Sequence, residues 1–199
     1  MLISGSGSNL QSIIDNAQAI ELDLCAVISN KADAYGLERA KKANIPTHVI
    51  DHTQFNSREE FDTQLSTIID QHQAELVILA GFMRILTAEF TQKYTGKMLN
   101  IHPSLLPKFQ GLHTHQRALD AGESEHGVSV HFVTAELDGG PVIAQEKVAI
   151  LPDDDANTLA ARVLAKEHQL YPKVIHYFTQ GRLSYHDNQA LLDGEAVCL

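Results

Sequence analysis

The 199-residue sequence predicts an α/β fold, in which a mainly parallel sheet is flanked by helices and extended by antiparallel strands towards the C-terminus. Between residues 2 and 102, short apolar runs alternate with segments of helical periodicity, which is typical of parallel strands joined by helical crossovers. The run at 76–80 is entirely apolar, as expected for a strand covered on both faces. Residues 128–133 show a period of two instead, which indicates a strand with one more polar face.

The elements of the parallel half follow one another closely. Ser57 is expected to cap the third helix, with Glu60 completing a capping box. The alternation predicts a Rossmann-like sheet with helices on both faces. Strands are predicted at 2–3, 22–29, 47–50 and 76–80, with a further strand ending at 98–99, and helices after the turn at 5–9, over 34–43, from residue 57 and after residue 87.

The pattern changes after His115. A short helix is predicted over 117–121, and the runs at 128–133 and 142–150 indicate a hairpin-like, antiparallel pair. A long helix is predicted from Asp155 to about residue 178 in spite of Pro172. The last residues are expected to form a polar tail with one short strand at 182–184, and the whole chain, 1–199, to be one domain.

Composition limits the possible partners. A net charge of −10 argues against nucleic acid, because neutralising phosphates needs a basic surface. No apolar run is long enough to span a bilayer, and the first residues do not resemble a secretory signal. The two cysteines, Cys25 and Cys198, imply no disulfide framework and suit a reducing compartment. We therefore expect a cytoplasmic protein with small-molecule partners, without membrane or nucleic-acid binding, as a monomer or weak homodimer.

The glycine-rich segment 5–9 lies between a predicted strand and a predicted helix, an arrangement typical of an anion-binding turn. It does not match the dinucleotide fingerprint, because Leu10 takes the place of the third glycine and the next strand ends in Ser29 and Asn30 instead of an acidic residue. It also lacks the Gly-Lys-Ser/Thr of a P-loop. A single phosphate is the favoured ligand, and a plain strand–helix turn is the alternative.

Asn100 and His102 are candidate catalytic residues. In an extended segment their spacing puts both side chains on one face, and Pro103 favours that extended conformation at His102. An amide donor beside an imidazole suits a reaction in which a carbonyl becomes a tetrahedral oxyanion. The alternative is a proline-stiffened surface loop whose side chains cap backbone groups.

Ligands of parallel sheets bind outside the carboxyl ends of the strands. This rule predicts that segments 5–9, 81–86 and 100–102 line one crevice. Asp138 precedes a Gly-Gly-Pro turn, and a carboxylate there would orient His102 and favour its protonated form, as a general acid requires. An ordinary turn aspartate is the alternative.

Three histidines, His102, His113 and His115, raise the alternative of a metal site. The glycine before them and the helix expected after them make the required geometry unfavourable, and no acidic or thiol ligand is near in sequence. We therefore expect no metal. Nucleophilic catalysis is also disfavoured, because Cys25 falls in a predicted buried strand and no serine lies in a G-x-S-x-G elbow.

Five motifs identify a family that this sequence resembles. The run NIHPSLLP marks the formyltransferase superfamily, and GLHTH together with the single-domain length points to one branch of it. The sequence thus resembles the phosphoribosylglycinamide formyltransferases, a folate-dependent family of purine synthesis, over essentially its whole length. The motifs are ISGSGSNL at 3–10, LAGFMRIL at 79–86, LNIHPSLLP at 99–107, GLHTH at 111–115 and LDGGPV at 137–142.

The resemblance implies transfer of the formyl group of 10-formyltetrahydrofolate, a cosubstrate, to the amine of 5′-phosphoribosylglycinamide, without a metal or a covalent intermediate. By this resemblance Asn100 donates its amide to the oxyanion, His102 acts as the acid, and Asp138 positions His102 and a relaying water. The ribonucleotide is expected at Gly7, Ser8, Asn9 and Glu167. The folate is expected at Met83, Arg84, Ile85, Leu86 and Asn100, with Arg58 and Arg84 near its glutamate tail.

Two other functions stay open on the sequence alone. A hydrolase that uses water in place of the amine would share Asn100, His102 and Asp138, and it would release formate without the ribonucleotide. A non-catalytic nucleotide-binding module would keep the glycine-rich turn but would not need His102 and Asp138 together.

Overall fold

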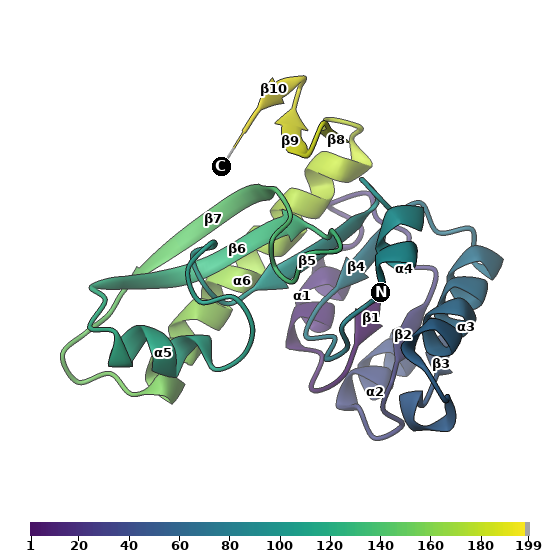
Figure 1. The fold of residues 1–199 in the computed structure, drawn as a ribbon, viewed down its shortest axis with the longest axis horizontal. Helices are drawn as coiled ribbons and strands as arrows, with labels where there is room; N and C mark the ends of the chain where they lie inside the picture. The colour runs from purple at the N-terminus through teal and green to yellow at the C-terminus, as the bar shows by residue number, and fades with distance from the viewer. Residues whose placement is uncertain (198–199) are drawn as a thin grey trace.

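The computed structural model describes residues 1–197, which form a seven-stranded and a three-stranded sheet (Figure 1). The strand order of the larger sheet is β3-β2-β1-β4-β5-β6-β7, with its first four pairings parallel and its last two antiparallel. This confirms the predicted α/β fold and its antiparallel addition. The strands are β1 (Leu2–Ile3), β2 (Val27–Ser29), β3 (Thr47–Val49), β4 (Val77–Leu79), β5 (Met98–His102), β6 (Glu125–Phe132) and β7 (Val142–Ala149).

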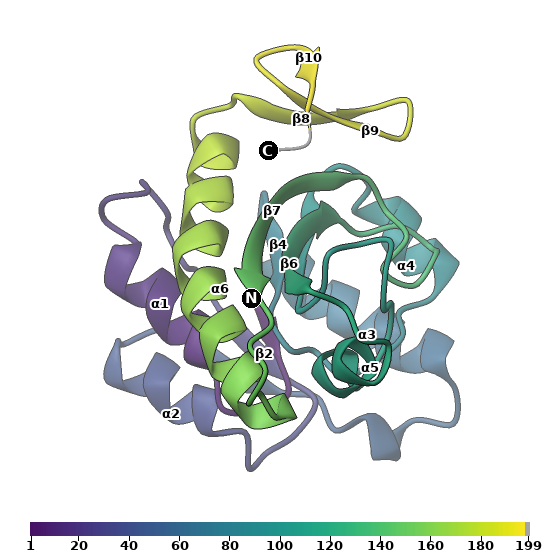
Figure 2. The same cartoon turned by 90° about the vertical axis from the view of Figure 1, so that its left-hand side faces the viewer.

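Helices cover both faces of the sheet (Figure 2). α1, α2 and α6 lie on one side, and α3 and α4 on the other. Because neighbouring strand residues point to opposite faces, Leu2 belongs to the core under α3 and α4, whereas Ile3 belongs to the core under α1 and α6. The helices are α1 (Ser8–Asn16), α2 (Tyr35–Lys42), α3 (Arg58–Gln71), α4 (Ala88–Lys93), α5 (Thr114–Asp120) and α6 (Ala156–Thr179), with a 3₁₀ turn at His52–Gln54.

The long helix α6 forms hydrogen bonds with two parallel strands at the centre of the sheet. Asp155 caps its first turn in a capping box with Thr158. The hydroxyl of the fully buried Tyr171 lies 2.8 Å from the carbonyl oxygen of Leu79 and 3.0 Å from that of Leu99, so its one proton is shared between backbone oxygens of β4 and β5. Pro172 lies inside this helix, as predicted. No helix among residues 1–197 combines the length and the low polarity needed to cross a bilayer.

Three predicted elements differ from the structure in the parallel half and at α5. The strand expected at 22–29 begins only at Val27, because β1 offers it only Leu2 and Ile3 as ladder partners. Ser57 caps α3 by accepting the Glu60 N–H, but the Glu60 carboxylate accepts from the amide of Asn56, so the box is not completed. The helix expected at 117–121 spans 114–120.

The C-terminal segment was predicted to hold one strand, and this was wrong. It forms a three-stranded antiparallel sheet of β8 (Leu183–His186), β9 (Gln189–Leu192) and β10 (Glu195–Ala196). The two connections have positive φ at both central positions, Asp187-Asn188 and Asp193-Gly194, which is typical of tight hairpin turns. Cys198 lies outside the described residues.

Candidate active site

Three loops meet at the carboxyl ends of β1, β4 and β5, which are neighbours in the sheet. Ser4, buried at the end of β1, joins two of them: its Oγ accepts the Met83 N–H (2.8 Å) and donates to the side chain of Asn30. The third loop follows Asn100 and His102 in β5. Segments 5–9, 81–86 and 100–102 therefore follow neighbouring strand ends, as predicted, but the cavity described below is lined by residues of the second and third segments and by none of 5–9.

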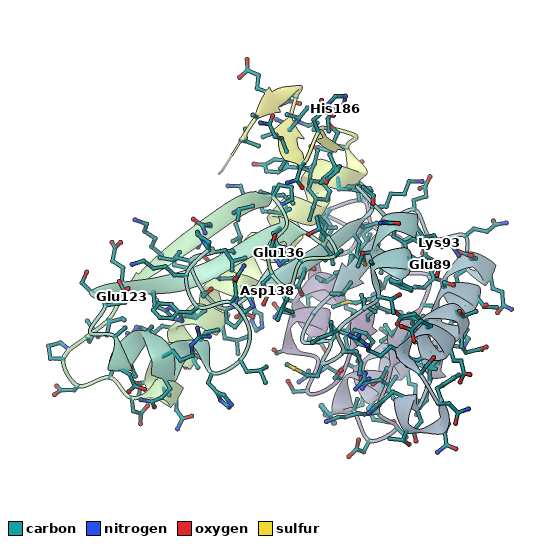
Figure 3. The ribbon with its side chains drawn as sticks, in the orientation of Figure 1. Glu89, Lys93, Glu123, Glu136, Asp138 and His186 are labelled. Atoms are coloured by element: carbon teal, nitrogen blue, oxygen red, sulfur yellow. The ribbon has the colours of Figure 1, made fainter. Side chains whose placement is uncertain are left out.

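The connection between β6 and β7 folds back over this edge of the sheet. Figure 3 shows Asp138 and Glu136 on it, in the middle of the molecule. Oδ2 of Asp138 lies 3.4 Å from Nδ1 of His102 and accepts the Gly111 N–H (2.9 Å). Its Oδ1 lies 3.5 Å from Nδ2 of Asn100. The structure thus brings Asn100, His102 and Asp138 together, as the sequence predicts.

The His102 ring is held between two acceptors. Its side chain is 8% exposed, and its Nε2 donates to the carbonyl oxygen of Phe109 (2.9 Å) while its Nδ1 faces the Asp138 carboxylate. A carbonyl oxygen can only accept, so the proton on Nε2 is required by this contact. The Phe109 contact therefore fixes the orientation of the ring, with Nδ1 turned towards the Asp138 carboxylate.

His131 orients Asn100, although it was not among the predicted site residues. The two residues are register partners in β5 and β6, and Nδ2 of Asn100 lies 3.1 Å from Nε2 of His131. Nδ1 of His131 donates to the Phe132 carbonyl (2.8 Å), so Nε2 is left as an acceptor. Burial lowers the pKa of His131, which keeps the ring neutral. The available signal in the sequence was a histidine on the more polar face of the run at 128–133.

A cavity opens beside these residues. Its walls come from β4, the 82–86 loop, α4, β5 and residues 131–138, and Asn100, His131 and Asp138 are among its lining residues. His102 does not line it, so Asp138 connects the ring to the cavity. Half of its lining residues are apolar, with Leu79, Val133 and Leu137 among them, and the other half carry polar or charged side chains. Such a mixed lining can contact both the ring faces and the polar edges of a heterocycle.

Only some of the residues expected at the folate line this cavity. Arg84, Ile85 and Leu86 line the cavity. Met83 does not line it and is 58% exposed, although its amide bonds to Ser4. Arg58 does not line it either; it lies exposed at the start of α3. The Arg84 guanidinium lies 5.9 Å from the ring of Phe61, which follows Arg58 by three residues in α3.

The glycine-rich loop forms a second part of the site. Gly7 has φ +70°, and α1 begins at Ser8, so the amides of Ser8 and Asn9 precede the first intrahelical bond, from Gln11 N–H to Gly7 O. Nδ2 of Asn9 donates to the Glu167 carboxylate of α6 over 2.6 Å. The structure therefore brings together Gly7, Ser8, Asn9 and Glu167. Burial raises the pKa of Glu167, and the Asn9 bond opposes this.

The histidines of the 111–115 motif do not join His102. His113 has a left-handed backbone at the start of α5, and Nδ1 of His115 lies 3.1 Å from Nε2 of His126. Among residues 1–197, no three His, Cys, Asp or Glu side chains are grouped so that they could hold a metal ion.

Comparison with known proteins agrees with this geometry. A model of the formyl transferase family matches residues 1–175. The phosphoribosylglycinamide formyltransferase of Escherichia coli K12 is 55% identical over 199 residues, covering 99% of this chain and 94% of that protein. The corresponding protein of Haemophilus influenzae is 51% identical with the same coverage.

Solved structures are similar in fold as well as in sequence. A phosphoribosylglycinamide formyltransferase from Coxiella burnetii, solved in complex with CHES, superposes with a TM-score of 0.95 at 55% identity, over 98% of this chain and 93% of that one. A glycinamide ribonucleotide transformylase from Symbiobacterium toebii gives a TM-score of 0.92 at 41% identity, over 96% and 91% of the two chains. The chain belongs to the phosphoribosylglycinamide formyltransferase family.

Proposed function

We propose that Asn100, His102 and Asp138 catalyse the reaction that follows from family membership. The chain is a folate-dependent formyltransferase: it transfers the formyl group of 10-formyltetrahydrofolate to the amine of 5′-phosphoribosylglycinamide, giving formylglycinamide ribonucleotide and tetrahydrofolate. Asp138 is the main support for the catalytic roles, because it lines the cavity and its two carboxylate oxygens face His102 (3.4 Å) and Asn100 (3.5 Å).

Asn100 stabilises the oxyanion. The substrate amine attacks the formyl carbon, and the carbonyl oxygen gains negative charge as the tetrahedral intermediate forms. One N–H of Asn100 is committed to His131 at 3.1 Å, and the other makes only a 3.5 Å contact to Asp138. An oxyanion at short range is a stronger acceptor than this distant carboxylate, so the second N–H donates to the oxyanion as its charge develops.

His102 and Asp138 manage the protons. The attacking amine must lose a proton, and the folate nitrogen must gain one before it leaves. His102 supplies the titratable ring, and Asp138 orients it and a water that relays the proton to the cavity. The Gly111 N–H to Asp138 (2.9 Å) fixes the carboxylate for this role.

The two substrates occupy opposite sides of the catalytic residues. The ribose phosphate binds the free amides of Gly7, Ser8 and Asn9 and the side chains of Ser8 and Asn9, and Glu167 of α6 accepts hydrogen bonds from the sugar hydroxyls. The folate ring lies in the cavity along Met83, Arg84, Ile85, Leu86 and Asn100. Arg58 and Arg84 bind the carboxylates of the glutamate tail at the cavity mouth.

The remaining expectations concern the chain as a whole. One formyltransferase domain over 1–199 is supported by the continuous seven-stranded sheet. A net charge of −10 supports a protein that binds neither nucleic acid nor anionic membranes. Cytoplasmic location and a monomer or weak homodimer complete the proposal.

Formyl transfer followed by folate absorbance, with and without the ribonucleotide, tests this function. In His102→Ala and Asp138→Asn we expect the ribonucleotide-dependent rate to fall by ~10²–10³, the typical loss for one catalytic donor. His186→Ala is the matched control, since that ring is 72% exposed on β8 and should not affect turnover. Formate release without the ribonucleotide would identify a hydrolase instead, and no turnover in the parent would leave only a binding module.

A further inference from the structure

Arg39 of α2 reaches across to the glycine-rich loop. Its Nε donates to the carbonyl oxygen of Ser6 (2.9 Å), and its Nη1 donates to Oε1 of Gln11 in α1 (3.1 Å). The guanidinium lies 5.0 Å from the centre of the Tyr35 ring, within the range of a cation–π contact. Arg39 takes part in none of the ion pairs formed among residues 1–197. Its donors are therefore directed at the loop and the helix that follows it.

The start of α2 packs directly against the same loop. The Gly36 N–H donates to the carbonyl oxygen of Gly5 (3.0 Å). A Cβ on Gly7 would lie 2.6 Å from Cα of Gly36, so only glycine allows this approach. α1 and α2 lie side by side in both views (Figures 1 and 2). The loop at 5–7 thus packs between the two helices.

These contacts determine where the loop amides point. In a trans peptide the C=O of one residue and the N–H of the next point in opposite directions. The carbonyls of Gly5 and Ser6 are both held by α2, so the amides of Ser6 and Gly7 point away from it. The third carbonyl, of Gly7, accepts from Gln11 in α1. The carbonyls of Gly5, Ser6 and Gly7 therefore all accept hydrogen bonds from α1 or α2. This leaves the amides of the loop on the side that is open to a ligand.

We propose that Arg39 is a positioning residue for the ribonucleotide phosphate, because it holds the Ser6 peptide so that the loop amides face the phosphate. This rests on the proposed function, which assigns the loop to that phosphate. The guanidinium also adds positive charge where the chain, with a net charge of −10, would otherwise repel an anion. Its charge is felt as far as α6, where burial and then Arg39 lower the pKa of His168, the neighbour of Glu167.

Three variants separate positioning from charge. Arg39→Ala removes both. Arg39→Lys keeps the charge but loses the planar fork that reaches Ser6 and Gln11 together. Lys42→Ala removes one positive charge from an exposed site on the same helix and is the matched control. For each, KM for the ribonucleotide, KM for the formyl-folate, kcat, and competitive inhibition by inorganic phosphate are measured at constant ionic strength, after the melting temperature has been checked.

Arg39→Ala should raise the ribonucleotide KM and the phosphate Ki by roughly 10- to 100-fold, as expected for the loss of a charged hydrogen bond. We expect kcat and the folate KM to change by less than about twofold, because the formyl-transfer residues are untouched. Arg39→Lys should recover only part of the loss, and Lys42→Ala should resemble the parent. If the alanine variant does not fold, the comparison of Arg39→Lys with the parent decides.

Other results would overturn the proposal. An unchanged ribonucleotide KM in Arg39→Ala would show that the loop keeps its shape without this residue. Full recovery in Arg39→Lys, or an equal loss in Lys42→Ala, would mean that charge alone matters. A parent without ribonucleotide-dependent turnover would overturn the proposed function itself, whereas an active parent with an unaffected Arg39→Ala would overturn only the role of Arg39.

Discussion

The amide of Asn100 donates to Nε2 of His131 across 3.1 Å, and this bond determines which end of the amide faces the Asp138 carboxylate. His131 can accept only because its own Nδ1 is committed to the Phe132 carbonyl and because burial keeps the ring neutral. A protonated or rotated His131 would offer a donor, and Asn100 would then turn its oxygen towards the ring. The oxyanion donor is therefore set by a side chain that need not touch the substrate.

We expect His131→Leu to lower kcat by roughly 10- to 100-fold, since the Asn100 amide would lose the partner that orients it. The ribonucleotide KM should change little, because His131 is far along the sheet from the glycine-rich loop. The measurement is a double-mutant cycle with Asn100→Ala. Once Asn100 is absent, His131→Leu should have almost no further effect on kcat; additive losses would show that His131 acts independently.

Much of the site could be predicted because it depends on strand order. Parallel strands have their carboxyl ends at one edge of the sheet. Once β1, β4 and β5 are recognised as parallel strands, the loops that follow them are expected at that edge. Asp138 was also found, since a Gly-Gly-Pro turn between two strands returns the chain to the sheet. These inferences use local pattern and topology only.

The parts that could not be predicted depend on register and on backbone atoms. His131 faces Asn100 only because β6 pairs with β5 in one register, and residue spacing does not reveal that register. The second acceptor of His102 is the carbonyl of Phe109, which any residue could supply. The C-terminal sheet was missed although Asp193-Gly194 is a recognised hairpin signal, because its strands are only two to four residues long.

Gly7→Ala should weaken ribonucleotide binding and destabilise the fold. A side chain at φ +70° is strained, and the new Cβ would lie 2.6 Å from Cα of Gly36, so α1 and α2 must separate. Gly122→Ala is the matched control: its φ is +66°, but a Cβ there would meet nothing within 4 Å. Urea unfolding should show a loss of about 1–3 kcal/mol for a strained backbone in both variants, with a further loss in Gly7→Ala. Equal losses would mean that the contact with Gly36 relaxes freely.

Ser4→Ala should impair folate binding more than catalysis. Ser4 holds the Met83 amide at 2.8 Å, so its removal frees the loop that carries Arg84, Ile85 and Leu86 into the cavity. Loss of this buried partner corresponds to about 1–3 kcal/mol, part of which should appear as a raised folate KM. Ser184→Ala, at an exposed position in β8, is the control. A folate KM equal to that of the parent would show that the 82–86 loop is held by other contacts.

His126 should make the protein less stable as the pH falls. This ring is 1% exposed, and burial, followed by the neighbouring His115, lowers its pKa to about 4. In the unfolded chain a histidine takes up its proton near pH 6.5, so between about pH 6.5 and 4 the unfolded state binds more protons than the folded state. The free energy of unfolding must therefore decrease as the pH is lowered through this range. Urea unfolding between pH 4.5 and 7 should give a shallower dependence in His126→Gln than in the parent, while His186→Gln, on the surface, should keep the parent's slope. If the slope of His126→Gln equals that of the parent, the acid sensitivity of the fold arises at other groups.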